Sequence, residues 1–508
     1  MPSGTSIALA LGTLVLTRVA AVIIYRLYLC PLKSIPGPLL QAVTNIPHDI
    51  ACIRGTRHKH LEKLHAKYGP IVRVAPFEVS IIDNSIWRDV FGFRRNDVEC
   101  PKGDIQERIN GYSGILDTNR ADHRRFRRLL AHAFSEQSLR QQEHRMAQQV
   151  DMLIAGLRKQ SPKGPLDITL WVQWTTFDIM GDLSLGESFR SMEKMETHPW
   201  QQFLLDNIAA ATWIGIAERW GFRRFINWLT PPSLMRAVFE YYELNSSMIM
   251  KRIKLGKERG DFLDHILKHD LIEDNKNEDI KGMHIEELKN TAGDIALAGS
   301  ETTATLLAGL FYYLLMNPAV LDKVTEEVRT LPHDEDITIA STSKLPYFVA
   351  VLEEGLRIFP PAPLPACREI PPGGNAVGGY FFPAGTRVHP VHHVAYNSPL
   401  NFARPKEFIP ERWMANRPEE FKDDNPGGVF QPFSYGPRNC IGNNLAKAEM
   451  RLILAKLLWH FDLSRPDPGT VEGKDWGKWT DKLRVYFLWH KPPLMVNIKE
   501  RGDMTVKA

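Results

Sequence analysis

Residues 433–442 of the chain read Phe-Ser-Tyr-Gly-Pro-Arg-Asn-Cys-Ile-Gly, and this stretch decides the fold. A cysteine sulfur that binds iron must be deprotonated and held in an apolar setting, and the amides of a tight loop can donate hydrogen bonds to it. Gly436 and Gly442 let the backbone bend tightly and approach a flat ring closely. A helix that begins near Asn443 points the positive end of its dipole at the loop. For a lone cysteine a buried free thiol is the usual interpretation, but the whole pattern favours a metal-binding thiolate at Cys440.

The same ten residues match the F-x-x-G-x-R-x-C-x-G motif of the cytochrome P450 family at every fixed position, and the chain resembles that family over nearly its whole length. The phrases Ala-Gly-Ser-Glu-Thr-Thr at 298–303 and Pro-Pro-Gly-Gly at 371–374 are most similar to fungal members of specialised metabolism. The resemblance implies a mainly α fold with a minor β region and a haem b whose iron is bound by the Cys440 thiolate. It also implies haem contacts from the motif residues Phe433, Gly442 and Arg438, the last to a propionate.

The activity that the resemblance implies is monooxygenation, in which one oxygen atom of O2 enters a lipophilic small molecule. The substrate would be a terpenoid, polyketide or alkaloid-type intermediate of fungal secondary metabolism. Electrons would come from a separate NADPH-cytochrome P450 reductase, with cytochrome b5 as a further donor. Two rivals stay open: a reductase-independent haem-thiolate enzyme that rearranges or dehydrates an oxidised substrate, and a non-enzymatic haem sensor or electron carrier. The Glu-Thr pair at 301–302 argues against the first, and a roomy pocket would be superfluous in the second.

Composition limits the class of protein. No Gly/Ser-rich linker, charge block or repeat divides the 508 residues after residue 40, so residues 39–508 are predicted to form one haem-binding monooxygenase domain. The 63 basic and 59 acidic residues give a net charge of +4, which does not favour nucleic-acid binding. The five cysteines are odd in number and include no C-x-x-C pair, so neither a disulfide framework nor a four-cysteine zinc site is expected.

The amino terminus is predicted to be a transmembrane anchor covering residues 1–30. Residues 7–24 are apolar or small except for two threonines and Arg18, and about 20 apolar residues suffice to span a bilayer. A cleaved signal peptide is the alternative, but no Lys or Arg precedes the apolar run. Arg26 and Lys33 follow it, which favours a cytosolic location for the rest of the chain. We therefore expect a single-pass protein of the endoplasmic reticulum membrane, with its catalytic domain facing the cytosol.

Residues 31–38, Pro-Leu-Lys-Ser-Ile-Pro-Gly-Pro, are predicted to form a stiff proline-rich hinge and not a helix. The longest helical block runs from 285 to 316 without proline and ends at Asn317-Pro318. At about 1.5 Å per residue it would be roughly 45–50 Å long. Further expected elements are strands at 71–74, 79–82, 483–487 and 495–498, small sheets within 360–400, and helices at 345–358 and 443–461.

The 285–316 helix carries candidates for oxygen chemistry. Small side chains around Ala298 would leave room for dioxygen, and the hydroxyl of Thr302, with Glu301 as its acidic partner, resembles the proton relay of the family. The alternative is that Thr302 only bonds the backbone of its own helix. Asp294 lies on the same stripe, where related fungal sequences usually carry an apolar residue. It would either contact a polar or basic group of the substrate or be an ordinary solvated or capped aspartate.

The resemblance also assigns residues that hold the haem propionates. His123 and Arg127 have the spacing of the family's W-x-x-x-R contact, with His in place of Trp. Arg368 is placed like the propionate arginine that follows the Glu-Arg helix. A charge run is usually a solvated face, but in this family the side nearest the cysteine docks an acidic reductase. The basic residues that would form that face are Arg124, Arg125 and Arg128.

Structural and substrate-binding residues complete the predicted site. Glu354 and Arg357, three apart on an apolar helix, share a face and need partners if they are buried. By resemblance they form a structural triad with Arg412. The substrate pocket is predicted to include the 100–118 loop and the residues Asp294, Ala298, Tyr486 and Phe487. A cluster of aromatic residues would be either ordinary core or a lid at the membrane surface, namely Trp213, Trp220, Phe222, Phe225 and Trp228.

Overall fold

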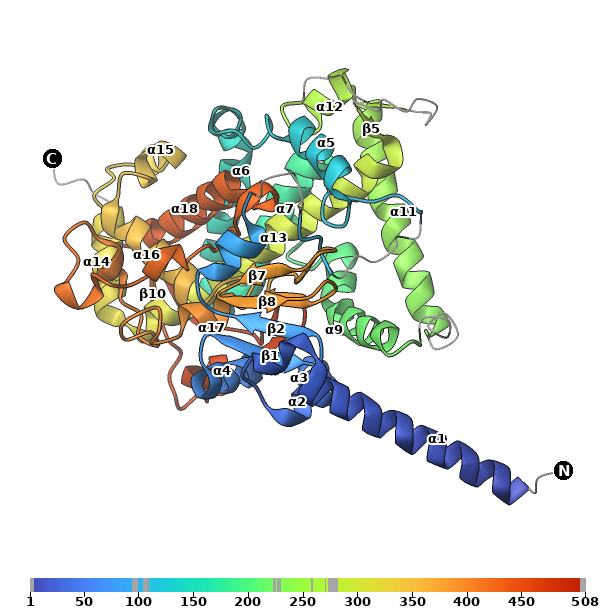
Figure 1. Ribbon diagram of the computed structural model, residues 1–508. Coiled ribbons are helices and arrows are strands. Elements are labelled where there is room, and N and C mark those ends of the chain that lie inside the picture. The colour runs from blue at the N-terminus through green and yellow to red at the C-terminus, as the bar shows by residue number, and fades with distance from the viewer. Residues whose placement is uncertain are drawn as a thin grey trace. The chain divides into compact units, whose positions relative to one another are not determined.

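The computed structural model describes residues 4–93, 99–103, 108, 110–222, 225, 230–256, 259–269, 271–272 and 282–502. They form many helices and a few small sheets, which confirms the predicted mainly α fold (Figure 1). The chain folds into two compact units. Unit 1 comprises Met1–Asp104, Leu364–Asn401 and Asn425–Arg438, and unit 2 comprises Ile105–Pro363, Phe402–Asp424 and Asn439–Ala508. Because the chain passes back and forth between the units, no linker in the sequence marks a boundary.

Unit 1 contains a four-stranded sheet in the order β1-β2-β9-β6. β1 (Ile71–Ala75) pairs antiparallel with β2 (Glu78–Ile81), and β2 pairs in parallel with β9 (Arg387–Pro390). Every residue of β1 and β2 is buried, including the polar residues Arg73, Glu78 and Ser80, and both strands overlap the predicted ones at 71–74 and 79–82. The other elements of unit 1 are α1 (Gly4–Ile24), η1 (Tyr25–Leu29), η2 (Pro31–Ser34), α2 (Leu39–Val43), α3 (Ile46–Ile53), α4 (Arg57–Tyr68), η3 (Trp87–Phe91), β6 (Arg368–Glu369), the hairpin β7 (Asn375–Val377) and β8 (Tyr380–Phe382), α17 (His392–Tyr396), η10 (Pro426–Gly428) and η11 (Gly436–Arg438).

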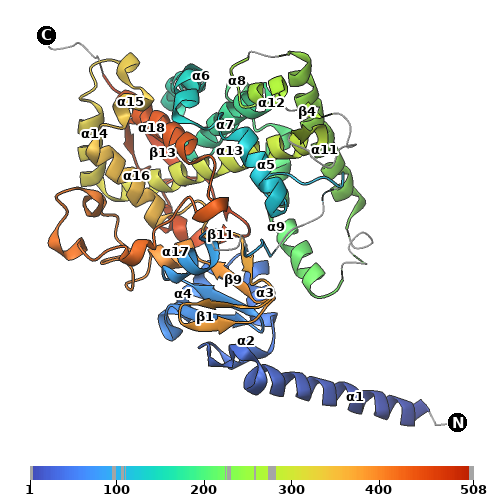
Figure 2. The same cartoon turned by 45° about the horizontal axis from the view of Figure 1, so that its top comes forward.

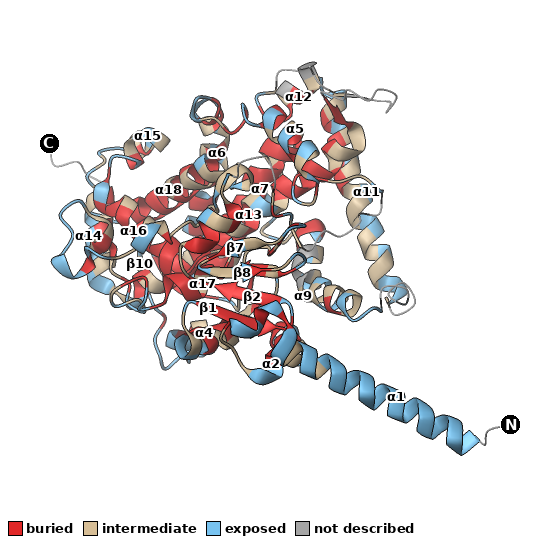
Figure 3. Cartoon of the chain, viewed as in Figure 1, coloured by how far each residue is buried: buried red, intermediate tan, exposed pale blue. Residues whose placement is uncertain are grey.

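The first helix of unit 1 fits the predicted anchor. Together α1 and η1 form a continuous span, Gly4–Leu29, that is long and apolar enough to cross a membrane and is not buried against the rest of the protein. Figure 3 shows α1 exposed along its length, in contrast with the buried strands β1 and β2 of the same unit. An apolar helix with no protein around it needs another apolar environment. The structure is therefore compatible with a membrane anchor at the amino terminus.

The proline-rich segment differs from its prediction. Pro31–Ser34 is a short 3-10 helix, because proline is acceptable at the start of a helical turn, so the prediction that this segment is not helical was wrong in its first half. Only the second half, from Ile35 to Pro38, is extended. Leu32 and Ile35 are buried in the core of unit 1, and the backbone amide of Arg73 donates to the carbonyl of Pro36 at 2.8 Å. The segment is thus fixed to β1.

Unit 2 is mostly helical. Its small sheets are β10-β13-β3, the antiparallel pair β11-β12 and the parallel pair β4-β5. Its elements are α5 (Arg120–Leu130), α6 (Glu136–Gln160), η5 (Ser161–Lys163), β3 (Leu166–Asp167), α7 (Ile168–Met180), η6 (Gly181–Leu185), α8 (Ser191–Lys194), α9 (Pro199–Arg219), α11 (Pro232–Lys254), α12 (Asp264–His269), β4 (Leu271–Ile272), β5 (Met283–His284), α13 (Ile285–Met316), α14 (Pro318–Val328), η7 (Asp334–Asp336), α15 (Ile339–Thr342), α16 (Pro346–Ile358), η8 (Pro410–Trp413), η9 (Glu419–Phe421), α18 (Asn443–His460), β10 (Phe461–Ser464), η12 (Trp476–Lys482), β11 (Arg484–Val485), β12 (Trp489–His490) and β13 (Met495–Glu500).

The long helix of unit 2 has the predicted bounds. α13 covers Ile285–Met316, and it begins at a capping box in which the side chain of His284 accepts from a backbone amide while Glu287 accepts from the backbone of His284. α13 lies beside α7 (Figure 2). A Cβ at Gly299 would lie 2.5 Å from Cε of Met180 on α7, so a larger residue there would require the flexible Met180 side chain to move.

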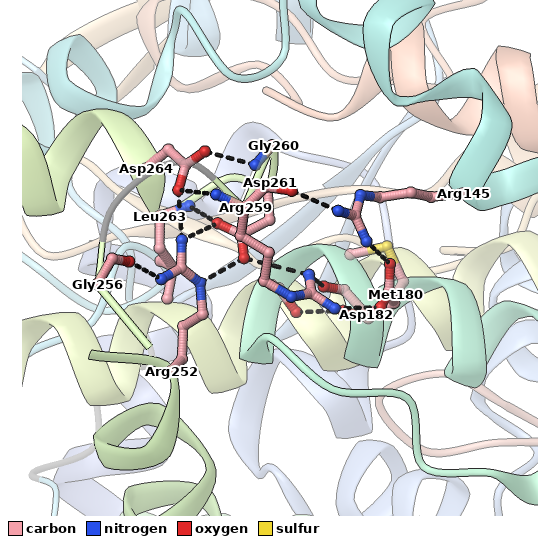
Figure 4. Close-up of polar contacts among 11 residues, drawn as sticks. Arg145, Met180, Asp182, Arg252, Gly256, Arg259, Gly260, Asp261, Leu263 and Asp264 are labelled. Carbon is pink, nitrogen blue, oxygen red and sulfur yellow. Dashed lines mark hydrogen bonds and ion pairs between the residues drawn. The ribbon is translucent and has the colours of Figure 1, made fainter. Parts of the chain in front are cut away.

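An ion-pair cluster ties together α6, η6, the end of α11 and the start of α12 within unit 2 (Figure 4). Arg252 Nε donates to Asp261 Oδ2 at 2.5 Å, and both side chains are fully buried. Arg259 pairs with Asp182, which also accepts from Arg145 at 3.2 Å. Each arginine therefore faces at least one aspartate, as buried charges require.

The aromatic cluster of unit 2 is not ordinary core. Its described members are exposed by about half of their surface, namely Trp213, Trp220, Phe222 and Phe225. Trp228 lies outside the described residues. Exposed aromatics at this density are typical of a surface that contacts another apolar phase.

Candidate functional site

The Cys440 loop requires glycine at one of its two predicted positions. Gly436 has φ +76°, and a Cβ there would lie 1.9 Å from the carbonyl oxygen of Phe91, so only glycine fits. Gly442 has φ −84°, which any residue adopts, and a Cβ there would meet Cys440 Sγ at an ordinary 3.8 Å. Gly442 is the N-cap of α18, which begins at Asn443 as predicted. The idea that Gly442 is needed for a tight bend is therefore wrong.

Cys440 differs from the other cysteines of the chain. All five are described and none is in a disulfide, and Cys440 is exposed whereas the other four are buried. Although solvent reaches the residue, the protein packed around its thiol raises the pKa by desolvation, while a hydrogen bond from the Gly442 amide and the charge of Arg127 oppose that rise. A thiol that receives an amide hydrogen bond at the start of a helix, on a residue that solvent reaches, is suited to bind a metal as thiolate.

Arg127 holds the backbone next to this cysteine. Its Nη1 and Nη2 donate to the backbone carbonyl and the side-chain oxygen of Asn439, each at 2.5 Å. Burial lowers the pKa of Arg127, and the Cys440 thiol acts in the opposite direction. His123 lies one turn earlier on α5 and is buried. The predicted contacts of both residues with a propionate stay predictions, but the structure shows that Arg127 positions the loop residue that precedes Cys440.

The burial of α13 is interrupted at the predicted oxygen site. Between Asn290 and Tyr312, the residues that are not buried are Leu297, Ala298, Gly299 and Thr302. An exposed Ala298 in the middle of an otherwise buried helix marks an open space on that face. The hydroxyl of Thr302 donates to the carbonyl of Ala298 at 2.6 Å, so the helix backbone is its acceptor in this structure.

Glu301 is held by partners that the sequence did not reveal. Lys491, in the segment between β12 and β13, forms an ion pair with Glu301, and both side chains are buried. Gln173 on α7 donates to Glu301 at 2.8 Å, and the Thr305 hydroxyl donates at 3.2 Å. Lys491 Nζ also donates to Thr305 at 2.7 Å. No motif spacing connects these residues, because Lys491 lies 190 positions after Glu301 in the chain.

Two arginines of unit 1 share one carboxylate. Arg438 forms an ion pair with Glu99, and Arg368 Nη1 lies 3.6 Å from Oε1 of the same residue. Arg368 is buried against the ring of Phe91 at 4.7 Å, and its Nε and Nη1 make no hydrogen bond with any residue that the structure describes. Burial lowers the pKa of Arg368 to about 10, and the positive charge of Arg438 adds to this shift. A buried cation with unused donors beside a second cation is suited to bind an anionic group such as a propionate.

The remaining residues of the loop and the pocket occupy different surroundings. Phe433 lies three residues before Gly436 and is half-buried. Tyr486 and Phe487 lie in the turn between β11 and β12, where Tyr486 is half-buried and Phe487 is exposed. The predicted contacts of these residues with a haem or a substrate stay predictions.

The structure brings together the predicted charge triad. Arg357 donates to both oxygens of Glu354 at 2.8 and 2.7 Å, and Arg412 Nε donates to Glu354 at 3.2 Å. Glu354 also accepts from the backbone amide of Ile409 and from the indole of Trp413, each at 2.9 Å. All three charged residues are buried with their hydrogen bonds satisfied, which is the arrangement of a structural element.

Asp294 does not present a free carboxylate. Its Oδ1 and Oδ2 accept from Arg108 Nη2 at 2.7 and 2.9 Å, and Oδ2 also accepts from the backbone amide of Leu116 at 3.3 Å. Burial raises the pKa of Asp294, and Arg108 opposes that rise. The geometry therefore favours a partnered aspartate over a direct contact with a basic substrate group.

Comparison with known proteins identifies the family of this arrangement. Residues 33–497 match the family model described as Cytochrome P450. The chain is 38% identical to averantin hydroxylase of Dothistroma septosporum, over 97% of this chain and 91% of that protein. It is 39% identical to the cytochrome P450 monooxygenase stcF of Emericella nidulans, over 94% and 96% of the two chains. It is 37% identical to trichothecene C-15 hydroxylase of Fusarium sporotrichioides, over 96% of each.

Proposed function

Because the chain belongs to the cytochrome P450 family, it is a haem b monooxygenase, and we propose that it hydroxylates a lipophilic intermediate of fungal secondary metabolism. Three similar proteins, an averantin hydroxylase, a trichothecene hydroxylase and a monooxygenase, support this class of reaction. The observation that carries the proposal is the exposed residue Cys440, whose thiol receives the Gly442 amide hydrogen bond at the start of α18. When bound, the haem supplies the activation of O2 and the insertion of one oxygen atom.

In this proposal the thiolate of Cys440 would hold the haem iron, and arginine side chains would hold the propionates. Arg368, with two unused donors, and Arg438 provide the guanidinium groups of unit 1. Arg127 fixes the residue before Cys440, and His123 lies on the same helix. A thiolate fixed by a hydrogen-bonded loop stays in one orientation, which is the protein's main means of tuning the bound metal.

Protons reach the open face of α13 through Thr302 and Glu301. Thr302 has a hydroxyl at that face, and it can deliver a proton only after it exchanges the Ala298 carbonyl for another acceptor. Glu301 is kept in place by Lys491 and Gln173 on the neighbouring side of the helix. We assign proton transfer to Thr302 and Glu301, and a positioning role to Lys491.

The proposed redox partners and the proposed membrane location follow from the assignment as a monooxygenase. A separate NADPH-cytochrome P450 reductase, with cytochrome b5 as a second candidate, supplies the electrons to the enzyme. α1 anchors the chain in the endoplasmic reticulum membrane, with the rest of the chain in the cytosol. The exposed residues Leu39 and Leu40, which follow the anchor on α2, continue its apolar surface. Five free cysteines fit a reducing compartment.

The test is an incubation of the full-length protein, in membranes, with reductase, NADPH and an extract of a host strain that lacks the gene. With 18O2 in place of air, we expect one extract compound to be replaced by a product that carries a single labelled oxygen. A product formed without NADPH, or one without label, would replace the proposal by the rearrangement alternative. If no compound is consumed although the haem is reduced, the protein is a carrier or a sensor.

A further inference from the structure

A polar stripe on the first half of α13 binds the segment that precedes α5. Glu286, Asn290 and Asp294 are spaced four residues apart and therefore lie on one face of the helix. Asn110 Nδ2 donates to Glu286 at 3.1 Å, and Asn290 Nδ2 donates to the carbonyl of Tyr112 at 2.7 Å. Each member of the stripe thus contacts the chain between 108 and 118, all within unit 2.

The end of this stripe is its most strongly charged contact. Asp294, which is buried, accepts both of its short hydrogen bonds from Arg108, whose Nε donates to Asp117 at 2.5 Å. Asp117 in turn accepts from the backbone amide of Gly114 at 2.7 Å. Two carboxylates and one guanidinium therefore close a small ring of charge-assisted bonds around the turn at 114–117.

Gly114 shows how closely the segment fits against the helix. A Cβ at Gly114 would lie 2.2 Å from Oδ2 of Asp294 and 3.0 Å from Nη2 of Arg108. A contact of 2.2 Å is well below van der Waals distance, so any side chain larger than glycine must displace either the Asp294 carboxylate or the segment and thereby disturb the ion pair. The approach of the segment to the helix is thus determined by the ion pair and by the missing side chain together.

The position of this segment affects the site on both sides. Its last residues lead directly into α5, which carries His123 and Arg127. Asp294 lies eight residues before Thr302 on the same face of α13, which is about 12 Å along the axis at 1.5 Å per residue. The clamped turn therefore connects the helix that holds the Cys440 loop with the open face of α13.

We propose that Arg108, Asp294 and Gly114 form a clamp that fixes residues 110–118 against α13 and thereby sets how large a molecule the substrate space accepts. The clamp is made of directional polar contacts, so it fixes one position of the turn instead of allowing it to slide. Leu116, whose amide is bound by Asp294, keeps an exposed side chain. This inference rests on the proposed function, because a size limit is meaningful only if a substrate binds there.

The test compares two azoles of different size on the haem-loaded, full-length protein. Imidazole and clotrimazole both bind haem iron through a ring nitrogen, and each affinity is read from the shift of the Soret band. Asp294→Asn removes the charge pair and Gly114→Ala disturbs it without changing charge. For both variants we expect the affinity ratio of clotrimazole to imidazole to change about tenfold or more. Asp182→Asn, which breaks an arginine–aspartate pair of the cluster in Figure 4, is the matched control and should leave the ratio unchanged.

Hydrogen exchange of the same proteins provides a readout that does not depend on ligand binding. Peptides that cover 110–118 should exchange about tenfold or more faster in both clamp variants and not in the Asp182→Asn control. Faster exchange with an unchanged azole ratio, or unchanged exchange, would overturn the clamp while leaving the proposed function intact. If the unaltered protein gives no Soret shift with imidazole, the proposed function itself fails, and the size limit fails with it.

Discussion

Two clusters of buried arginine, one in each unit, differ in how completely their charges are matched. In unit 2 the triad arginines surround Glu354, and none of their buried nitrogens lacks a partner. In unit 1 Arg368 and Arg438 share the carboxylate of Glu99, and within the described part of the chain two nitrogens of Arg368 make no hydrogen bond. An unmatched buried charge is unfavourable. The Glu354 cluster, whose charges are matched, is therefore a structural element, whereas the Glu99 cluster is suited to bind an additional anion. Between these two clusters, the unused donors distinguish the arginines that are suited to bind an anion from the structural ones.

The largest effect is expected where the matched cluster is broken. Glu354→Ala leaves Arg357 and Arg412 buried without their shared carboxylate, which should lower the free energy of unfolding by about 4–5 kcal/mol. Urea unfolding of the purified protein measures this change. Glu353→Ala, on the same helix but with only a 3.7 Å contact to Lys447, is the control and should lose less than about 1 kcal/mol. Equal losses in both variants would contradict the distinction.

The buried pair of Glu301 and Lys491 allows the effect of an unmatched charge to be measured at the candidate site itself. Lys491→Met leaves Glu301 buried without its cation, and we expect a loss of about 3–4 kcal/mol in stability. The double variant Glu301→Gln/Lys491→Met removes both charges and should recover most of that loss. Lys478→Met, which breaks a solvent-exposed pair, should have little effect. If the double variant is no more stable than Lys491→Met alone, the two residues are not energetically coupled.

A substitution in the unmatched cluster of unit 1 should weaken the binding of haem. Arg368→Met removes a group with unused donors, so we expect haem affinity to fall by about 1.5–3 kcal/mol, or roughly 10- to 150-fold. The rate of haem transfer to excess apomyoglobin is the measurement, and it does not require a substrate. Arg88→Met, an exposed arginine of the same unit, is the control. An unchanged transfer rate for Arg368→Met would remove the reason to call this cluster a propionate site.

The smallest effect concerns Glu449, a buried acid that forms no ion pair with the residues that the structure describes. Burial raises the pKa of Glu449 to about 8, whereas its hydrogen bond with Thr303 opposes the rise. The folded protein then holds a proton that the unfolded chain releases above its ordinary pKa of 4.5, so stability falls as pH rises from 4.5 to about 8. The side chain cannot ionise in Glu449→Gln. As the pH rises from 6 to 8, the free energy of unfolding of this variant should therefore increase by about 1–2 kcal/mol relative to that of the unaltered protein. Parallel pH profiles of unfolding would contradict this shift.

Local sequence signals predicted much of this molecule. The bounds of α13 followed from a proline-free block that ends at Asn317-Pro318, and the start of α18 followed from the Cys440 motif. The strands β1 and β2 were predicted from β-branched apolar residues at 71–74 and 79–82 that end at turn residues. Glu354 and Arg357 could be paired because their spacing places them on one helix face.

Partners from distant segments could not be predicted. Lys491 beside Glu301, Glu99 between two arginines and Arg108 beside Asp294 belong to loops that carry no periodic pattern. Such contacts depend on how the whole chain folds, and one sequence contains no signal for them. Each of these partners would have been an unremarkable charged surface residue by composition alone.

The central claim is that Cys440 alone binds the haem iron as thiolate, and the absorption spectrum of the reduced carbon monoxide complex tests it most directly. We expect the unaltered full-length protein to show the red-shifted Soret band of thiolate ligation. Cys440→Ser should lose that band, whereas serine at each of the four buried cysteines, Cys30, Cys52, Cys100 and Cys367, should leave it in place. A red-shifted band that survives in Cys440→Ser, or that is absent from the unaltered protein, would contradict the account.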